Sequence, residues 1–466
     1  MASLRSASLP TAGALIILLA LAPTAGCGVN RQIRKGDAAL ADGHLTPAGQ
    51  AYRAALERKP GEPRALLGLA RVALQDGDPE AAITPARTAY DAGTPGAAVV
   101  YARALLEGGQ GRDALAPAEA ALKANPDDME AAALIAEARL AMGDLKGALE
   151  AARGLESAPP RGRALAAWLY ARSGDMARAS TLVSQAAASG LSDVDVQTEA
   201  AAVLTMAGES AAARAAAREA VSLGASASRL ARDAARRDQG GDREGAIRRL
   251  AWAFALDDDD GRITARLGQL LLAQGDAERA AGFLERALTL PPYRDPKVGQ
   301  VTVARPDDWS EPERKQQVAE VQRALAYARG QRGDSRGAAA ALEQAALLNG
   351  ADAAGWLAVA DAWERARDAA AAREALIRAV GEDASNAAAR LRLARNLAAA
   401  GQLGPAIGHA RAGWELNPRD AEAALLLGSL YETRSETNSA REVYRIALGY
   451  VPGNKALAEA LARVGG

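Results

Sequence analysis

Apolar positions recur along most of the chain with the spacing of paired amphipathic helices. From about residue 30, two apolar stretches with helical spacing flank a small residue, and this unit returns every 31 to 34 residues. The residues at the central position are Gly43, Gly77, Gly109, Gly143, Gly174, Gly208, Gly241, Gly275, Gly333, Arg367, Gly401 and Ser435. An alanine stands five positions after each of them. A period of this length is typical of a helix–turn–helix solenoid, so the pattern predicts an all-α fold.

The residues inside each unit resemble those of the tetratricopeptide repeat. In that family the first helix carries Leu-Gly or Leu-Ala and then an aromatic residue, and the second carries Ala, a large residue, Ala and a closing Pro. The eighth unit has Leu267, Gly268, Gly275, Ala280, Leu284, Ala287 and Pro292, and the twelfth has Gly428, Tyr431, Ala440, Tyr444, Ala447 and Pro452. The resemblance covers nearly all of the chain after residue 30 and implies a right-handed superhelical solenoid of about twelve helix–turn–helix repeats. Each repeat would then pack only on its neighbours.

Units five to seven match the repeat less well than the others. Their second helices present mostly alanine, and Arg237 stands at a site that is usually apolar in the repeat. Because alanine buries little apolar area, we predict weaker interfaces and the fastest hydrogen exchange around residues 195–240.

The repeat pattern divides the chain into five segments. They are a signal peptide at 1–26, repeats one to eight at 27–292, an insertion loop at 293–312, repeats nine to twelve at 313–452, and a C-terminal capping helix at 453–466. The last segment is predicted to be an amphipathic helix with Leu457 and Leu461 on one face, which would cover the end of the array.

The insertion between repeats eight and nine interrupts the period. It contains a short β-like run at Val298–Val303 and ends in Ser310-Glu311-Pro312-Glu313. This ending is a capping-box pattern, which predicts a long first helix for repeat nine from here to about residue 330. Long loops inside regular arrays are often functional, and a tolerated spacer is the alternative. If the insertion binds a partner, we predict Tyr293 and Trp309 as the contact residues.

The N-terminus has the three parts of a secretory signal. Arg5 precedes an apolar run at Ala14–Ala22, and the small residues Thr24-Ala25-Gly26 follow. Cys27, the single cysteine of the chain, comes next, and this order resembles the bacterial lipobox, although Thr24 replaces the usual Leu, Val or Ile. The resemblance implies lipidation of Cys27, and Gly28 favours an outer-membrane lipoprotein that faces the periplasm of a Gram-negative cell. A secreted or cell-surface-anchored protein is the alternative.

Composition and charge argue against several other classes of protein. The 56 Lys and Arg residues balance 57 Asp and Glu residues, so no basic surface for nucleic acid is expected. Roughly a quarter of the residues are alanine and only 4% are aromatic, which suits closely packed helices. The two histidines, His44 and His409, lie in distant repeats, and no nucleophile or phosphate-binding motif is present. We therefore predict no catalytic residues, no metal site and no cofactor.

In the tetratricopeptide repeat family, a series of first-helix positions lines the concave surface where partners bind. Mapped onto this chain, the resemblance assigns partner-binding positions to Arg71, Arg103, Trp168, Tyr327 and Arg395. The Lys and Asn pattern with which eukaryotic members hold a chaperone tail is not present. The charges along the surface are mixed, so both a solvated surface and a groove for an extended or helical peptide remain open.

Together these features favour a non-enzymatic, lipid-anchored periplasmic scaffold whose partners are envelope proteins. Such a scaffold would help to assemble a pilus, secretion, motility or polysaccharide-export machine. The alternative is a membrane-tethered carrier or regulator of a peptidoglycan or polysaccharide enzyme. Either function implies binding to proteins, attachment to a membrane through the lipid, and no binding to nucleic acid.

Overall fold

A computed structural model describes residues 22–293 and 309–465, and all regular structure in these ranges is helical. Helices α1 to α14 are Ala22–Ala41, Leu45–Arg58, Pro63–Gln75, Pro79–Asp91, Ala97–Glu107, Gly111–Ala124, Met129–Ala141, Leu145–Leu155, Pro160–Ser173, Met176–Ser189, Val194–Met206, Ser210–Ser222, Ala227–Gln239 and Arg243–Leu256. Helices α15 to α25 are Gly261–Ala273, Ala277–Leu288, Glu311–Gln331, Ser335–Asn349, Ala353–Arg365, Ala369–Glu382, Ala387–Ala399, Leu403–Leu416, Ala421–Thr433, Thr437–Tyr450 and Lys455–Gly465. Helices α1 to α24 pair into twelve successive hairpins, which confirms the predicted helical solenoid. None of the described helices is long and apolar enough to cross a membrane.

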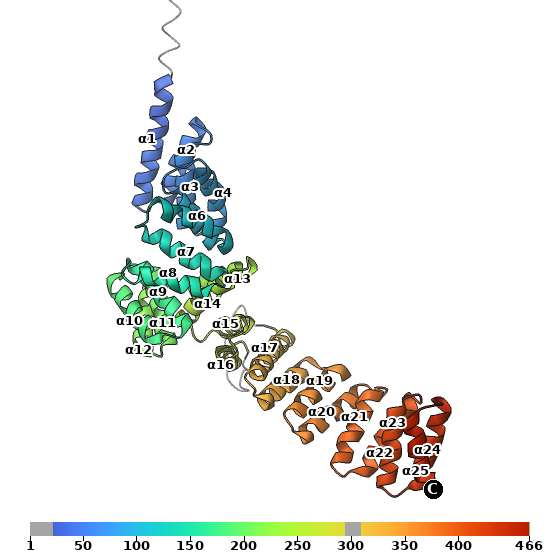
Figure 1. The fold of residues 1–466 in the computed structure, drawn as a ribbon. Helices are drawn as coiled ribbons and strands as arrows, with labels where there is room; N and C mark the ends of the chain where they lie inside the picture. The colour runs from blue at the N-terminus through green and yellow to red at the C-terminus, as the bar shows by residue number, and fades with distance from the viewer. Residues whose placement is uncertain (1–21, 294–308, 466) are drawn as a thin grey trace, which may run out of the picture. The chain divides into compact units, whose positions relative to one another are not determined.

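The chain divides into two compact units, residues 1–258 and 259–466. The first unit contains repeats one to seven, and the second contains repeats eight to twelve and α25. Within each unit, consecutive helices stack side by side, apart from α12 and α13 (Figure 1). The eighth repeat therefore belongs with the repeats that follow the insertion, although the sequence continues into it from repeat seven without a break.

The small residues between the two helices of each repeat adopt a left-handed backbone. The ten glycines of the series have φ between 75° and 92°, a conformation that glycine adopts at little cost. Arg367 and Ser435 hold the same conformation at φ of 57° and 63°. The second helix often begins with an Asp cap, as where Asp334 accepts a hydrogen bond of 2.8 Å from the backbone N–H of Gly337.

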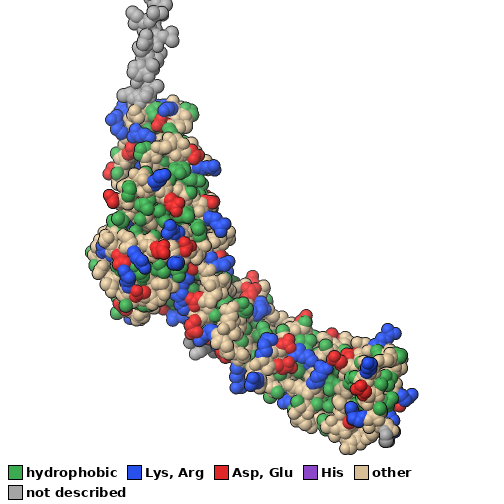
Figure 2. Space-filling view, in the orientation of Figure 1, with side chains coloured by type: hydrophobic (Ala, Val, Ile, Leu, Met, Phe, Trp, Pro, Cys, Tyr) green, Lys and Arg blue, Asp and Glu red, His purple; other side chains and the backbone are tan. Residues whose placement is uncertain are grey.

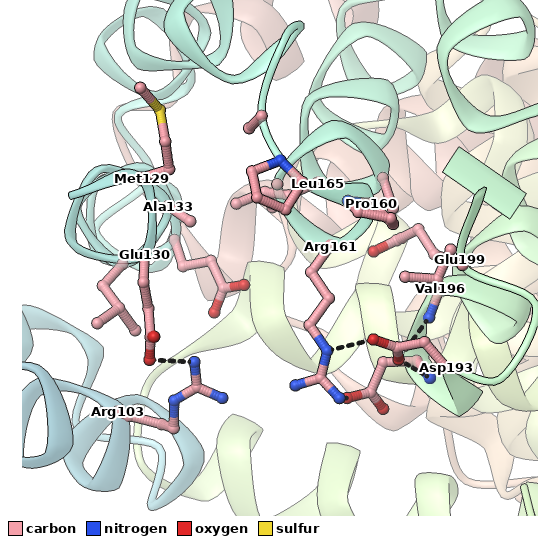
Figure 3. A pocket seen from close by; sticks show the side chains of 18 of the residues that line it. Arg103, Met129, Glu130, Ala133, Pro160, Arg161, Leu165, Asp193, Val196 and Glu199 are labelled. Carbon is pink, nitrogen blue, oxygen red and sulfur yellow. Dashed lines mark hydrogen bonds and ion pairs between the residues drawn. The ribbon is translucent and has the colours of Figure 1, made fainter. Parts of the chain in front are cut away.

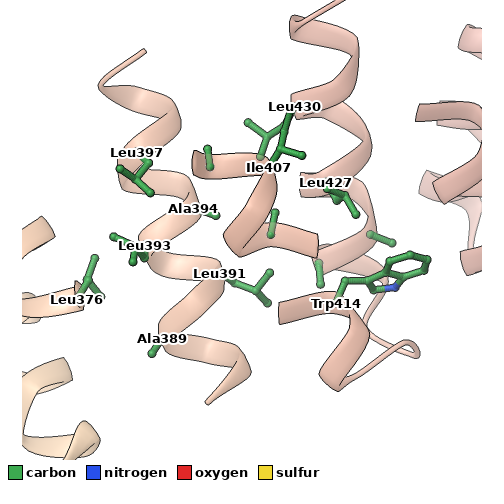
Figure 4. Close-up of a cluster of buried hydrophobic side chains, with 14 of the residues drawn as sticks. Leu376, Ala389, Leu391, Leu393, Ala394, Leu397, Ile407, Trp414, Leu427 and Leu430 are labelled. Carbon is green, nitrogen blue, oxygen red and sulfur yellow. The ribbon is translucent and has the colours of Figure 1, made fainter. Parts of the chain in front are cut away.

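Small buried side chains form most of the core. The alanine five positions after the turn is buried in eleven of the twelve repeats, and Ala338 is half-buried. In the second unit these alanines alternate with larger side chains such as Leu391 and Leu427, which join successive repeats into one cluster (Figure 4). Leu457 of α25 extends this cluster and is fully buried, as the predicted capping helix requires.

The insertion leads into a long helix, as the sequence predicts. Residues 294–308, which include the β-like run Val298–Val303, lie outside the described residues. The backbone N–H and the hydroxyl of Ser310 donate hydrogen bonds of 2.9 and 2.6 Å to Glu313. This pairing starts α17, which at 21 residues is longer than the first helix of any other repeat.

The seventh hairpin departs from the regular stacking. The first helices of the other repeats in this unit pack on the second helix of the repeat before, whereas α13 has no comparable packing against α12. Instead, α14 packs on α7, α11 and α12. A Cβ atom built on Gly240, in the α13–α14 turn, would lie 2.7 Å from the carbonyl oxygen of Gly109 in the α5–α6 turn. The two turns are therefore in direct contact, although 131 positions separate these glycines in the sequence.

The prediction that each repeat packs only on its neighbours is consequently wrong for this hairpin. It folds back over the first helices of repeats three to six. Arg237, which occupies an apolar position of the repeat pattern, is only 4% exposed and donates a hydrogen bond of 2.9 Å to Asp242. The charge is thus paired within the α13–α14 hairpin, beside Leu106 and Leu140 of repeats three and four.

Candidate functional site

Two adjoining cavities, which share several lining residues, lie in the first unit beneath and beside the α13–α14 hairpin. The inner cavity, of about 430 Å³, is lined by side chains of α5, α7, α9, α11 and α14. The outer cavity, of about 790 Å³, is lined by side chains of α3, α5, α7 and α13, among others. Arg103, Arg161 and Arg249 line both cavities. We call the two cavities together the slot; its walls are the first helices of repeats two to six and the folded-back hairpin.

Buried ion pairs hold α14 at the base of the slot. The guanidinium of Arg248 donates hydrogen bonds to Glu199 of α11 and, at 3.0 Å, to Glu137 of α7. The indole N–H of Trp252 donates a further bond of 2.9 Å to Glu199. Because Glu199 is 1% exposed, its charge is compensated by these contacts and not by water.

The protonation behaviour of this base follows from burial and from its arginines. Burial raises the pKa of Glu199, even though Arg248 opposes that shift. Burial also disfavours the charge of Glu137, but Arg248 and its neighbouring arginines outweigh it and lower the pKa of that carboxyl. Burial raises the pKa of Glu107, which lines both cavities.

Further charged contacts fix both helices of the hairpin. Arg172 of α9 donates two hydrogen bonds, of 3.1 and 2.7 Å, to Glu244 at the start of α14, and both side chains are more than nine-tenths buried. Asp233 of α13 accepts hydrogen bonds from Arg249 and Arg237. The hairpin is thus attached through buried polar pairs, which are more directional than apolar packing.

The rim of the slot is also built from ion pairs. Arg103 of α5 contacts Glu130 of α7 at 2.6 Å, and Arg161 of α9 contacts Asp193 before α11 at 2.5 Å (Figure 3). These pairs link the first helices of successive repeats. On the face shown in Figure 2, basic and acidic side chains are interspersed on each unit, in agreement with the mixed charge of the sequence.

The structure brings two of the predicted partner-binding residues to the slot. Arg71 is exposed and lines the outer cavity, and Arg103 is half-buried at the rim. Trp168, by contrast, is 1% exposed and belongs to the core of the first unit. Its bulk fills space between helices, so it offers no surface to a partner in this structure.

The other predicted surface residues lie in the second unit. Tyr327 of α17 is 62% exposed. Arg395 of α21 is exposed and lies 3.7 Å from Glu422, in an ion pair that water screens. Neither of them lines the slot.

Tyr293 and Trp309, the two aromatic residues of the insertion, pack against each other. Their ring centroids are 5.1 Å apart in an edge-to-face arrangement, and Tyr293 is 7% exposed. The guanidinium of Arg262, in α15, lies 4.9 Å from the centroid of the half-buried Trp309 ring. The pair therefore closes the ends of the insertion onto repeat eight.

We expect Trp309→Ala to destabilise the second unit by about 0.5–1.5 kcal/mol, because it removes the edge-to-face and cation–π contacts. Chemical denaturation of the full chain, followed by hydrogen exchange in α15 and α17, measures this loss. Tyr327→Ala is the matched control, since its exposed ring should contribute little. Unchanged stability combined with loss of a bound partner would instead make Trp309 a partner-contact residue.

The residues that build the base of the slot did not emerge from the repeat pattern. Glu199 directly precedes the apolar run Ala200–Leu204 of α11, and Arg248 and Arg249 interrupt the apolar sequence of α14. Charges of opposite sign inside or beside apolar helical runs indicate internal pairing. This signal is present in the sequence, but the repeat period gives no reason to pair helices of repeats four, six and seven.

The fold defines the protein as a helical-repeat protein whose concave slot is partly covered by the folded-back hairpin. The model of the tetratricopeptide repeat family matches residues 33–98, 102–162, 230–295 and 391–456, which together make up more than half of the chain. The chain therefore belongs to the tetratricopeptide repeat family, whose members generally act as scaffolds for protein–protein interactions. No curated protein matches the sequence.

Solved structures with a related fold include several tetratricopeptide repeat proteins. YrrB, described as a TPR protein with an unusual peptide-binding site, is 18% identical over 45% of this chain and 96% of its own, with a TM-score of 0.31. A chain of the Cut9–Hcn1 hetero-tetramer of the APC/C is 13% identical over 94% of this chain and 96% of its own, with a TM-score of 0.30. Yeast Tom70 is 13% identical over 94% of this chain and 95% of its own, with a TM-score of 0.26. These similarities concern the fold alone.

Proposed function

We propose that the protein is a non-enzymatic, lipid-anchored scaffold of the periplasm that binds envelope proteins during assembly of an envelope machine. The slot of the first unit is the observation that carries the binding part of this proposal. It is concave, it has polar groups from five or more helices, and its walls are fixed by buried ion pairs. Such a preorganised surface limits the ordering that binding requires.

The position of Cys27 supports the anchoring part. Val29 and Ile33 follow it in α1 and are 4% and 1% exposed, packed in one cluster with Tyr52 and Ala65. Cys27 lies within α1, two residues before the buried Val29, so a lipid on Cys27 would sit close to the docked part of this helix. The first repeats would be held close to the membrane surface.

We expect a clickable fatty-acid analogue to label the wild-type protein in cells and not the Cys27→Ser variant. Cell fractionation should place the wild type with the outer membrane and release the variant into the soluble periplasmic fraction. Equal labelling of both proteins would contradict the lipoprotein proposal. Labelling with recovery in the inner membrane would contradict the outer-membrane location only.

Site-specific photocrosslinking tests the scaffold function. A benzoylphenylalanine in place of Val99, a half-buried residue of the outer cavity, should crosslink an envelope protein in cells. Leu191, which is 64% exposed and does not line the slot, provides the control position. The crosslinked protein should lose its normal location when the scaffold gene is deleted. A partner that keeps its location, or crosslinks from both positions alike, would contradict the proposal.

A further inference from the structure

The slot differs from an open concave surface because the chain supplies a second wall. Arg71 lies on the wall formed by α3, and Arg229 lies on the wall formed by α13. A bound segment would contact both walls at once. Residues of repeat two and repeat seven would thus form one binding site.

Nearly all acidic groups of the slot are already paired. Glu130 contacts Arg103, and Asp193 and Asp195 both contact Arg161, at 2.5 and 3.5 Å. Glu137 and Glu199 contact Arg248, Asp233 contacts Arg249, and Asp128 accepts hydrogen bonds from the first N–H groups of α7. Glu107 is the exception, and burial raises the pKa of its carboxyl.

Two arginines of the outer cavity have no such partner. Arg71 and Arg229 are exposed, and within the described part of the chain neither contacts an acidic side chain. The outer cavity is lined by six arginines and five acidic residues, so its lining carries one excess positive charge, and Arg71 and Arg229 present their guanidiniums on opposite walls. Guanidinium groups bind carboxylates in a bidentate manner, so a partner with carboxylates is complementary to this surface.

The shape of the slot argues for an extended ligand. A helix, α14, already occupies the surface of α7 and α11 at the base. The single aromatic residue among those that line the slot is Trp252, which is 3% exposed and is covered by Arg249 at 4.1 Å. The slot therefore offers no aromatic face on which a sugar ring could stack.

We infer that the slot binds an extended acidic segment of a partner polypeptide, held between Arg71 on α3 and Arg229 on α13. This inference rests on the proposed scaffold function and specifies the partner's chemistry. The binding should weaken as the salt concentration rises, because both arginines are exposed to solvent.

Fluorescence polarisation with the full mature chain tests this inference. The probes are a fluorescein-labelled hexaglutamate peptide, a hexaglutamine peptide with the same label and blocked ends, and a labelled hexagalacturonate. We expect the wild type to bind hexaglutamate and to bind the other two much more weakly. Arg71→Ala and Arg229→Ala should each weaken hexaglutamate binding about five- to tenfold.

Two arginines on the same helices provide matched controls. Arg64 of α3 and Arg232 of α13 are exposed and do not line the slot, so Arg64→Ala and Arg232→Ala should leave binding unchanged. Equal binding of hexaglutamine, tighter binding of hexagalacturonate, or equal effects of the control variants would overturn the inference. If hexaglutamate fails to bind while Val99 still crosslinks an envelope protein, the acidic-segment inference is wrong and the scaffold function stands.

Discussion

Replacing Arg248 with methionine should destabilise the first unit by about 3–5 kcal/mol, because it leaves the buried carboxylate of Glu199 without its counter-charge. Arg248 is the residue through which α14 contacts both Glu199 and Glu137. Methionine fills much of the same space, so the loss reports on the charge and the hydrogen bonds. Chemical denaturation measures the free energy, and hydrogen exchange should rise in α13 and α14 first.

A surface arginine in the same unit serves as the control for this substitution. Arg87 pairs with Asp91 at 3.8 Å, with both side chains about two-thirds exposed, so Arg87→Met should change stability by less than about 0.5 kcal/mol. Adding Glu199→Gln to Arg248→Met should recover part of the loss, since the unpaired charge is removed. If Arg248→Met is as mild as Arg87→Met, buried ion pairs do not hold the hairpin.

The effect of Arg248→Met should also depend on pH. Burial already raises the pKa of Glu199, and removing Arg248 takes away the main attraction that opposes this shift. A carboxyl whose pKa is higher in the folded than in the unfolded protein favours folding below the unfolded pKa and loses this contribution as pH rises through the folded value. The variant should therefore be closer to wild-type stability at pH 5 than at pH 8.

Much of the fold could be predicted from the sequence because a solenoid is built from local contacts. The turn glycines, the buried alanines and the capping box at Ser310 each depend on contacts between residues that are close in the sequence. The repeat period therefore determines the helices and their pairing. Arg367 and Ser435 show that the period even identifies left-handed positions that lack glycine.

The folded-back hairpin could not be predicted in the same way. Its contacts join Glu244 to Arg172 and Arg248 to Glu137, and no periodic rule relates these positions. The predicted weakness around residues 195–240 stays a prediction for α12 and α13, in which few residues are buried, but the burial of α11 argues against it at the start of this range. All residues from Val196 to Leu204 are buried, because α14 covers a surface that a regular array would leave open.

Gly428→Ala should destabilise the second unit by about 1–3 kcal/mol, because the added methyl group would overlap a buried ring. A Cβ atom at Gly428, in α23, would lie within 3.0 Å of the Tyr444 ring of α24, a separation that real Cβ atoms do not show. The ring cannot move aside easily, since it is fully buried and its hydroxyl donates a hydrogen bond of 2.6 Å to Glu432. Glu432 also accepts hydrogen bonds from Arg463 of α25, so a displaced ring would disturb the capping helix as well.

A second glycine-to-alanine change separates this steric effect from helix propensity. Gly408 lies inside α22, and a Cβ atom there would meet nothing within 4 Å. Gly408→Ala should therefore stabilise the same unit by about 0.5–1 kcal/mol, because alanine loses less backbone entropy on folding.

In a Tyr444→Leu background, Gly428→Ala should destabilise the unit less than in the wild type. Denaturant titration of the wild type, the two single variants and the double variant gives this coupling energy. Equal signs for Gly428→Ala and Gly408→Ala in the wild type would show that close approach of α23 to Tyr444 does not limit packing at this repeat.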